Sequence, residues 1–255
     1  MRRVRVIPVL LIHDGGLVKT VKFKDPTYVG DPINAVKIFN EKEIDEIVIL
    51  DIDATALNRG PDMSKLKEIA GEAFIPLAYG GGISSVQQVQ ELFYLGLEKV
   101  IFNYQAYKSP ELLSASAKLV GSQSIVASMD VKKNWLGKFK VMVKNGKEDT
   151  GIDPVTYAKK ATDAGAGEIF LNMIDRDGTY SGYDLDMIEA VSHAVKVPLI
   201  ACGGASSLED FRKAISKGAS AVAAGSFFVF QRTHRAVLIS YPSQQDLKEQ
   251  VFTKL

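Results

Sequence analysis

Two segments of this chain carry the same sequence features in the same order. IPLAYGGGISSVQQVQELFYLGLEKVIFN, at 75–103, lies in the first half, and VPLIACGGASSLEDFRKAISKGASAVAAGS, at 197–226, lies in the second. Each contains a short apolar strand, a glycine pair, a small polar cap, an amphipathic helix, a glycine turn and a second strand. Such a repeat predicts a fold of two related halves, about 1–120 and 121–255.

Short β-branched runs alternate with amphipathic stretches along the whole chain, as in repeated β-α units on a parallel sheet. An open doubly wound sheet is the alternative, but its reversal of strand order would not produce a duplicated half. We therefore predict the α/β class and one (β/α)8 TIM barrel over 1–255, with a β-hairpin inserted at about 132–150 that turns at Asn145-Gly146. The predicted strands are 4–11, 46–51, 75–79, 99–103, 124–131, 168–173, 197–202 and 219–224, and helices are expected at 31–43, 86–95, 110–119, 153–164, 207–217 and 244–254.

Composition excludes several classes of function. Lys and Arg number 31 against 30 Asp and Glu, and the net charge of +1 creates no field that gathers nucleic acid or an anionic membrane. No apolar run approaches the roughly 20 residues of a membrane helix. The single cysteine, Cys202, excludes an internal disulfide, and the three histidines form no metal-binding pair. We expect a cytoplasmic protein without metal or cofactor.

Glycine-rich loops follow the third and seventh predicted strands. Each leads into a helix N-terminus, where backbone N–H groups bind anions well, and strands seven and eight commonly form the phosphate site of this fold. Tight βα turns are the simpler explanation of one such loop, but two related loops favour a bis-phosphorylated ligand across the barrel mouth. The first predicted cradle comprises Gly81, Gly82 and Asn103, and the second comprises Gly203, Gly204, Gly225 and Ser226.

Three further side chains are candidates for catalysis. Asp130 shares the inward face of strand five with Val126 and Ser128. Burial would raise its pKa and a hydrogen bond from Ser128 would lower it, so the direction is open, and a carboxylate that only caps a loop remains the alternative. Asp177, in the turn 175–179, either supplies an acid or forms an Asx turn. Lys19 lies in the long segment 14–30, which suggests a mobile lid, although a surface lysine would look the same.

Four predicted strands begin with an inward charge, at the end of the barrel opposite the glycine loops. Two positive and two negative charges can neutralise one another as a ring, which is the condition for tolerating them inside a barrel. The ring is either a plug that closes the floor or a gate for a small neutral molecule such as ammonia. Its members are Arg5, Glu46, Lys99 and Glu168.

These features together resemble the cyclase subunit of imidazole glycerol phosphate synthase, over nearly the whole chain. RVIPVLLIHDGGLVKT, GDPINAVKIFNEKEIDEIVILDI, IPLAYGGGISSV, DRDGTYSGYD and IACGGASSLEDF stand in that family's order and spacing. The resemblance implies a barrel that takes ammonia from a separate glutaminase subunit. It uses the ammonia to cleave and cyclise a phosphoribulosyl formimino aminoimidazole carboxamide ribonucleotide in histidine synthesis.

The resemblance also assigns individual residues. It favours the gate interpretation of the ring and implies that Gln123 and Glu98, near the barrel floor, face the glutaminase. Its phosphate cradles fall on Gly82, Asn103, Gly178, Gly204 and Ser226, and the neighbouring Thr179 is a further candidate.

The chain departs from the family at strand one. The family's two essential aspartates end strands one and five, and here strand one ends in Leu11, which cannot move protons. Asp14 is no substitute because the family already has an aspartate there, and Cys202 and Tyr104 alter the pocket further. The pattern resembles a related branch of lipopolysaccharide biosynthesis, in which the barrel and glutaminase supply ammonia to a third protein that aminates a nucleotide-linked acetamido sugar. A phosphosugar isomerase is the third hypothesis, which Leu11 also disfavours.

Overall fold

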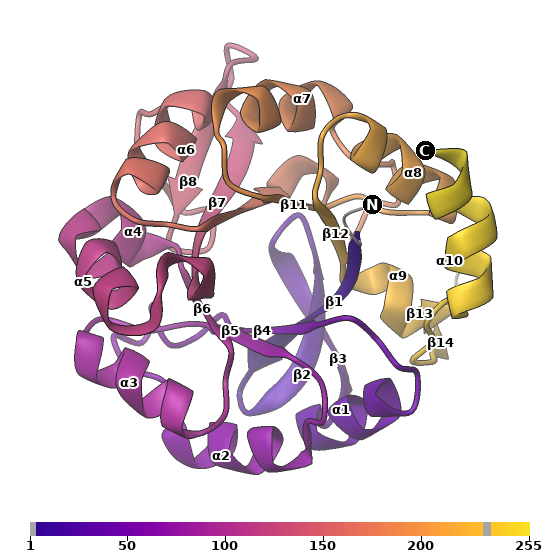
Figure 1. Cartoon of the computed structure of the whole chain (residues 1–255), viewed down its shortest axis with the longest axis horizontal. Helices are drawn as coiled ribbons and strands as arrows, with labels where there is room; N and C mark the ends of the chain where they lie inside the picture. Colours follow the sequence, from indigo (N-terminus) through magenta and orange to yellow (C-terminus); the bar gives the residue numbers. More distant parts are fainter. Residues whose placement is uncertain (1–3, 232–235) are drawn as a thin grey trace.

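Eight parallel strands close into a barrel in the computed structural model, which describes residues 4–231 and 236–255. Each strand pairs with the next, and β7 pairs with β10 and β12 with β1, so the ring is complete. Figure 1 looks into this ring, with helices outside it. The predicted single (β/α)8 TIM barrel is confirmed. Its strands are β1 (Arg5–His13), β4 (Ile47–Asp51), β5 (Leu77–Gly80), β6 (Lys99–Phe102), β7 (Ile125–Lys133), β10 (Glu168–Met173), β11 (Leu199–Cys202) and β12 (Ala221–Ala224).

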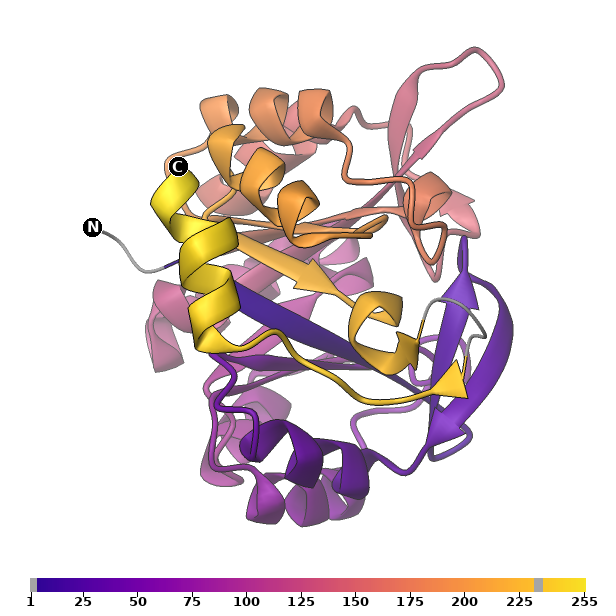
Figure 2. The same ribbon diagram turned by 90° about the vertical axis from the view of Figure 1, so that its right-hand side faces the viewer.

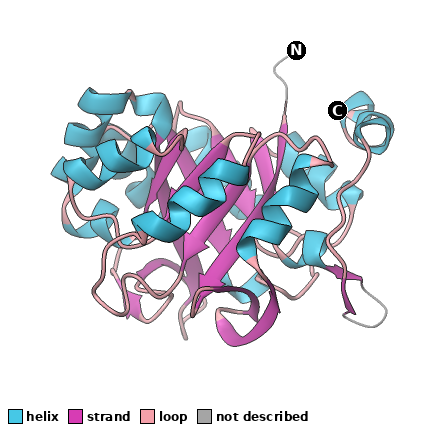
Figure 3. Cartoon of the chain, turned by 90° about the horizontal axis from the view of Figure 1, so that it is seen from below, coloured by secondary structure: helices cyan, strands magenta, loops and turns pink. Residues whose placement is uncertain are grey.

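Helices fill the outer layer, and side chains that accept a backbone N–H fix where many of them begin. Asp31 and Asp153 cap helices whose first residue is proline, and Ser85 and Ser207 cap equivalent helices of the two repeated segments. Figure 3 shows the strands flanked by these helices. They are α1 (Pro32–Asn40), α2 (Met63–Glu72), α3 (Val86–Tyr94), α4 (Tyr104–Lys108), α5 (Pro110–Val120), α6 (Pro154–Asp163), α7 (Leu185–Ala194), α8 (Leu208–Ser216), α9 (Ser226–Val229) and α10 (Gln244–Gln250).

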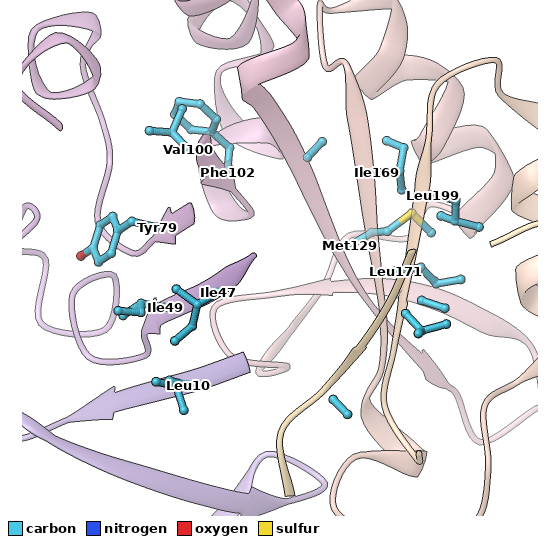
Figure 4. Close-up of a cluster of buried hydrophobic side chains, with 14 of the residues drawn as sticks. Leu10, Ile47, Ile49, Tyr79, Val100, Phe102, Met129, Ile169, Leu171 and Leu199 are labelled. Atoms are coloured by element: carbon cyan, nitrogen blue, oxygen red, sulfur yellow. The ribbon is translucent and has the colours of Figure 1, made fainter. Parts of the chain in front are cut away.

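The apolar core has two layers because successive strand residues point to opposite faces. One layer lies between strands and helices; Figure 4 shows part of it, including Leu10, Tyr79 and Phe102. The other fills the inside of the barrel. Its members are Ile7, Val9, Val48, Ala78, Ile101, Val126, Phe170, Ile200, Cys202, Ala221 and Ala223. Most of the barrel interior between floor and mouth is therefore apolar.

Two additional β-segments, one after β1 and one after β7, lie at the mouth of the barrel, and Figure 2 shows both at the same end. Segment 14–30, which the sequence suggested as a mobile lid, forms the strands β2 (Gly16–Val21) and β3 (Lys24–Gly30), and β1 continues to His13 and pairs with β2. The predicted insertion is a three-stranded meander of β7, β8 (Phe139–Val143) and β9 (Glu148–Asp149). Its second turn contains the predicted Asn145-Gly146, both at positive φ.

No helix in the described part of the chain combines the length and the apolar character that crossing a membrane requires.

Candidate active site

A cavity of about 830 Å³ opens at the carboxyl ends of the strands, and we call it the mouth pocket. It brings together Asp130, the first glycine cradle and polar groups from β1 and β4 that lie far apart in the sequence. A cavity of this size suits a small metabolite. Among the residues that line it are Leu11, His13, Asp51, Asp53, Arg59, Gly81, Gly82, Asn103, Tyr104, Ser128, Asp130, Lys144, Lys147 and Asn172.

Asp130 is a buried carboxyl, and two amides rather than Ser128 contact its oxygens. Asn103 Nδ2 lies 3.1 Å from one oxygen and Asn172 Nδ2 lies 3.5 Å from the other. Burial nevertheless dominates and raises the pKa of Asp130 to about 7. At neutral pH both protonation states are populated, which is the condition for a general acid or base.

Lys19 is 4% exposed, so the surface-lysine alternative is wrong. Its ammonium donates to the carbonyl of Val9, and burial lowers its pKa to about 8. A Cβ added to Gly225 would lie 2.8 Å from Lys19 Nζ, so the ammonium sits beside the second cradle. Lys19 therefore holds a positive charge where a phosphate is expected.

Asp177, in the loop after β10, forms hydrogen bonds with the β2–β3 hairpin. Its carboxylate accepts hydrogen bonds from Thr20 Oγ1 at 2.9 Å and from the backbone N–H of Phe23 at 3.4 Å. Burial raises the pKa of Asp177. The sequence had left two roles open for Asp177, an acid or an Asx turn. In the structure its side chain contacts β2 and the turn after β2.

The second predicted cradle surrounds a cavity of about 20 Å³, which has room for about one water molecule. Gly178, Gly203, Gly204, Gly225 and Ser226 all line it. A phosphate would need more room than this, so its binding here would require the lining loops to move apart. Thr179 does not line either cavity; its hydroxyl donates to the carbonyl of Arg176 at 2.7 Å and stabilises the turn.

Replacing Gly204 with alanine is expected to cost more stability than the same change at Gly96. Both glycines have φ near +100°, where a Cβ costs about 1–2 kcal/mol. A Cβ at Gly204 would also lie 2.2 Å from the carbonyl oxygen of Gly182, whereas nothing lies within 4 Å at Gly96. We expect an additional loss of about 1–3 kcal/mol for Gly204→Ala. Urea unfolding of both variants measures it, and equal losses would contradict the clash.

The four inward charges predicted at the floor form alternating ion pairs. Arg5 contacts Glu46 and Glu168, and Lys99 Nζ lies 2.9 Å from Glu46 and 2.8 Å from Glu168. Both glutamate side chains are 4% exposed. The ring separates the apolar interior from the floor surface.

Glu98 and Gln123, the predicted partner contacts, are exposed at the same end of the barrel. Each lies just before a strand, β6 or β7, so the fold places both beside the ring. Two aromatic residues that sequence reasoning did not select are also exposed: Phe74, in the connection before β5, is 85% exposed, and Tyr94, the last residue of α3, is 81% exposed. This end of the barrel therefore combines polar and aromatic exposed groups.

Sequence reasoning missed a set of polar residues on the side of the mouth pocket formed by β1 and β4. Asp51 forms a 3.0 Å ion pair with Arg59, and His13 Nδ1 lies 2.7 Å from Asp53 Oδ1. Extending strand one by two residues would have placed His13 on the inward face with Leu11. Nothing in the sequence around His13 predicts its contact with Asp53.

The family described as "Histidine biosynthesis protein" matches residues 5–234 of this chain. The chain belongs to this family. A relative from Pseudomonas aeruginosa, provisionally named imidazole glycerol phosphate synthase subunit hisF2, is 51% identical over 248 residues, covering 97% of the chain and 99% of the relative. A Vibrio vulnificus relative with the provisional name hisF3 is 47% identical over 251 residues, covering 98% and 96%.

Imidazole glycerol phosphate synthase subunit HisF of Alkaliphilus metalliredigens is 42% identical over 225 residues, covering 88% of the chain and 89% of that protein. The expected resemblance to HisF-type subunits is therefore confirmed.

Proposed function

We propose that this chain is the ammonia-using, cyclase-type subunit of a glutamine amidotransferase of the imidazole glycerol phosphate synthase type. Ammonia from a glutaminase subunit enters through the ring of Arg5, Glu46, Lys99 and Glu168. It then crosses the apolar interior and reacts with a bis-phosphorylated ribonucleotide in the mouth pocket. The observation that carries this proposal is a closed charge ring and a buried acid at opposite ends of one apolar barrel.

The apolar interior of the barrel suits the passage of ammonia. Ammonia is neutral and small, so an apolar interior admits it while disfavouring ions. The first glycine cradle lies on the wall of the mouth pocket, and Lys19 places a cation beside the second. Asp130, with a pKa of about 7, then exchanges a proton with the bound molecule.

A second candidate function is delivery of ammonia to a third protein, which aminates a nucleotide-linked acetamido sugar. The observation that favours it is Leu11, which packs on the interior apolar cluster and lines the mouth pocket on the strand opposite Asp130. In this role the ring and the glutaminase contact are needed, and cyclisation is not. The provisional names of the relatives hisF2 and hisF3 agree with a separate branch.

Turnover of the ribonucleotide with added ammonium salt distinguishes the two candidates. If the chain is a cyclase, the unmodified protein turns over faster than the buffer blank. If Leu11 has removed a proton-transfer group, Leu11→Asp raises turnover by about 10²- to 10⁴-fold, the usual contribution of one such group. Leu11→Asn is the matched control, because it is polar without being acidic.

A silent unmodified protein with an active Leu11→Asp variant would exclude the cyclase role and support ammonia delivery. The glutaminase step is tested separately by adding the purified partner. In both candidate roles the barrel binds the glutaminase and raises its rate of glutamine hydrolysis. A glutaminase that does not bind the barrel, and that hydrolyses glutamine no faster in its presence, would contradict both candidate functions.

A further inference from the structure

His13 occupies the last inward position of β1, directly above Leu11. Inward residues alternate along the strand, and Ile7 and Val9 belong to the interior cluster below. Two residues of strand rise about 6.6 Å, so His13 stands one step nearer the opening than Leu11. It lines the mouth pocket together with Asp130. β1 and β7 face each other across the ring, with three strands between them on either side.

The imidazole of His13 is held in place by a carboxylate. Nδ1 lies 2.7 Å from Asp53 Oδ1, and Asp53 Oδ2 accepts the backbone N–H of Asp14 at 2.8 Å. The Asp53 side chain is 13% exposed and that of His13 is 37% exposed. A carboxylate that occupies Nδ1 orients the ring and leaves Nε2 as the nitrogen for a bound molecule.

The charged surroundings of His13 favour its protonated form. Its hydrogen bond to Asp53, outweighing the effect of burial, raises the pKa of His13 above its ordinary value. Burial opposes ionisation of Asp53, but hydrogen bonds from the backbone N–H of Asp14 and from His13, together with the charge of Arg59, lower the pKa of Asp53. The titratable or charged groups beside the imidazole or elsewhere on the mouth-pocket wall are Asp14, Asp51, Asp53, Arg59, Tyr104, Asp130, Lys144 and Lys147.

We propose that His13, positioned by Asp53, is a second proton-transfer group of the mouth pocket, acting from β1 while Asp130 acts from β7. This inference rests on the proposed function, because it assigns a partner to the acid of the same reaction. One group gives a proton to the bound ribonucleotide as the other removes one, and exchange with water restores both. Asp53 is a positioning residue that keeps Nδ1 occupied.

The pH profile of kcat/KM for ammonia-dependent turnover tests the pair. The unmodified protein should give a bell-shaped profile, with one limb for each group. His13→Gln should lower the maximum by about 10²-fold and remove one limb, and Asp130→Asn should remove the other. Asp53→Asn should lower the maximum by about 10-fold and shift the limb that belongs to His13. His193→Gln, on α7 outside the pocket, is the matched control and should leave the profile unchanged.

A measurement that does not depend on turnover keeps the two proposals distinguishable. The His13 imidazole resonances are followed by NMR while the ribonucleotide is added, with His13→Gln used for assignment and thermal unfolding used to verify that each variant folds. Resonances that move on binding, in a protein that does not turn over, would contradict the cyclase function and support contact between His13 and the ligand. Resonances that stay fixed on binding, or a His13→Gln variant that keeps both limbs, would overturn the inference.

Discussion

Asp130→Asn is expected to lower ammonia-dependent turnover of the ribonucleotide by about 10²- to 10⁴-fold, the usual contribution of one proton-transfer group. Asparagine has nearly the same shape, and Asn103 and Asn172 remain as neighbours, so the mouth pocket should keep its form. The substitution removes the ionisable proton of the carboxyl group. Single-turnover kinetics with saturating ammonium salt measure the effect on chemistry alone.

The same substitution, which lowers turnover, is expected to raise the stability of the protein above pH 4. Burial raises the pKa of Asp130 to about 7, against about 4 for an unfolded chain. Between these values the native state binds more protons than the unfolded state, so this group lowers stability as pH rises from about 4 to 7. Asp130→Asn should therefore unfold at a higher temperature than the unmodified protein at pH 8, and the difference should shrink towards pH 4.

A variant that loses activity and also loses stability at pH 8 would indicate that the substitution disturbs the fold. A variant that keeps full activity would exclude Asp130 as the proton-transfer group. Ser128→Ala is a useful comparison, because Ser128 shares the wall of the mouth pocket and its side chain contacts neither Asp130 oxygen by a hydrogen bond in the described structure.

Removing Arg5 should have the largest effect on stability. Arg5→Met leaves two buried carboxylates, Glu46 and Glu168, with Lys99 as their remaining partner in the ring. Breaking a buried ion pair by removal of one partner costs about 3–5 kcal/mol, because an uncompensated charge stays inside. Urea unfolding at pH 7 measures the change.

The matched control is Arg212→Met, which breaks an ion pair with Glu209 on the outer surface of α8. Such surface pairs contribute about 0–1 kcal/mol. A loss at Arg5 no larger than that at Arg212 would contradict the view of the ring as a coupled buried network. The double variant Arg5→Met with Glu168→Gln should recover part of the loss, because one uncompensated carboxylate is removed with its partner.

Periodicity explains how much of this fold could be predicted from the sequence. All eight barrel strands overlap the predicted ranges, and the inward faces of β1 and β7 follow from side-chain alternation alone. The prediction was weakest at segment 14–30. Asp14-Gly15, a typical hairpin turn sequence, forms the turn between β1 and β2 and was not used, whereas the turn between β2 and β3 falls on Lys22 and Phe23, which are not typical turn residues. The two related halves stay a prediction, as do the phosphate and glutaminase contacts.

The sequence by itself determined the barrel, the end at which polar loops gather and the inward direction of Arg5, Glu46, Lys99, Glu168 and Asp130, because a period of two fixes which face each residue takes. Only the tertiary structure decided what those side chains meet. Asn103 and Asn172, not Ser128, contact Asp130; Lys19 is buried; and His13 pairs with Asp53, 40 positions away. Strand pairing creates these contacts between residues distant in the chain, and contact and burial together set the pKa values on which the proposed chemistry depends.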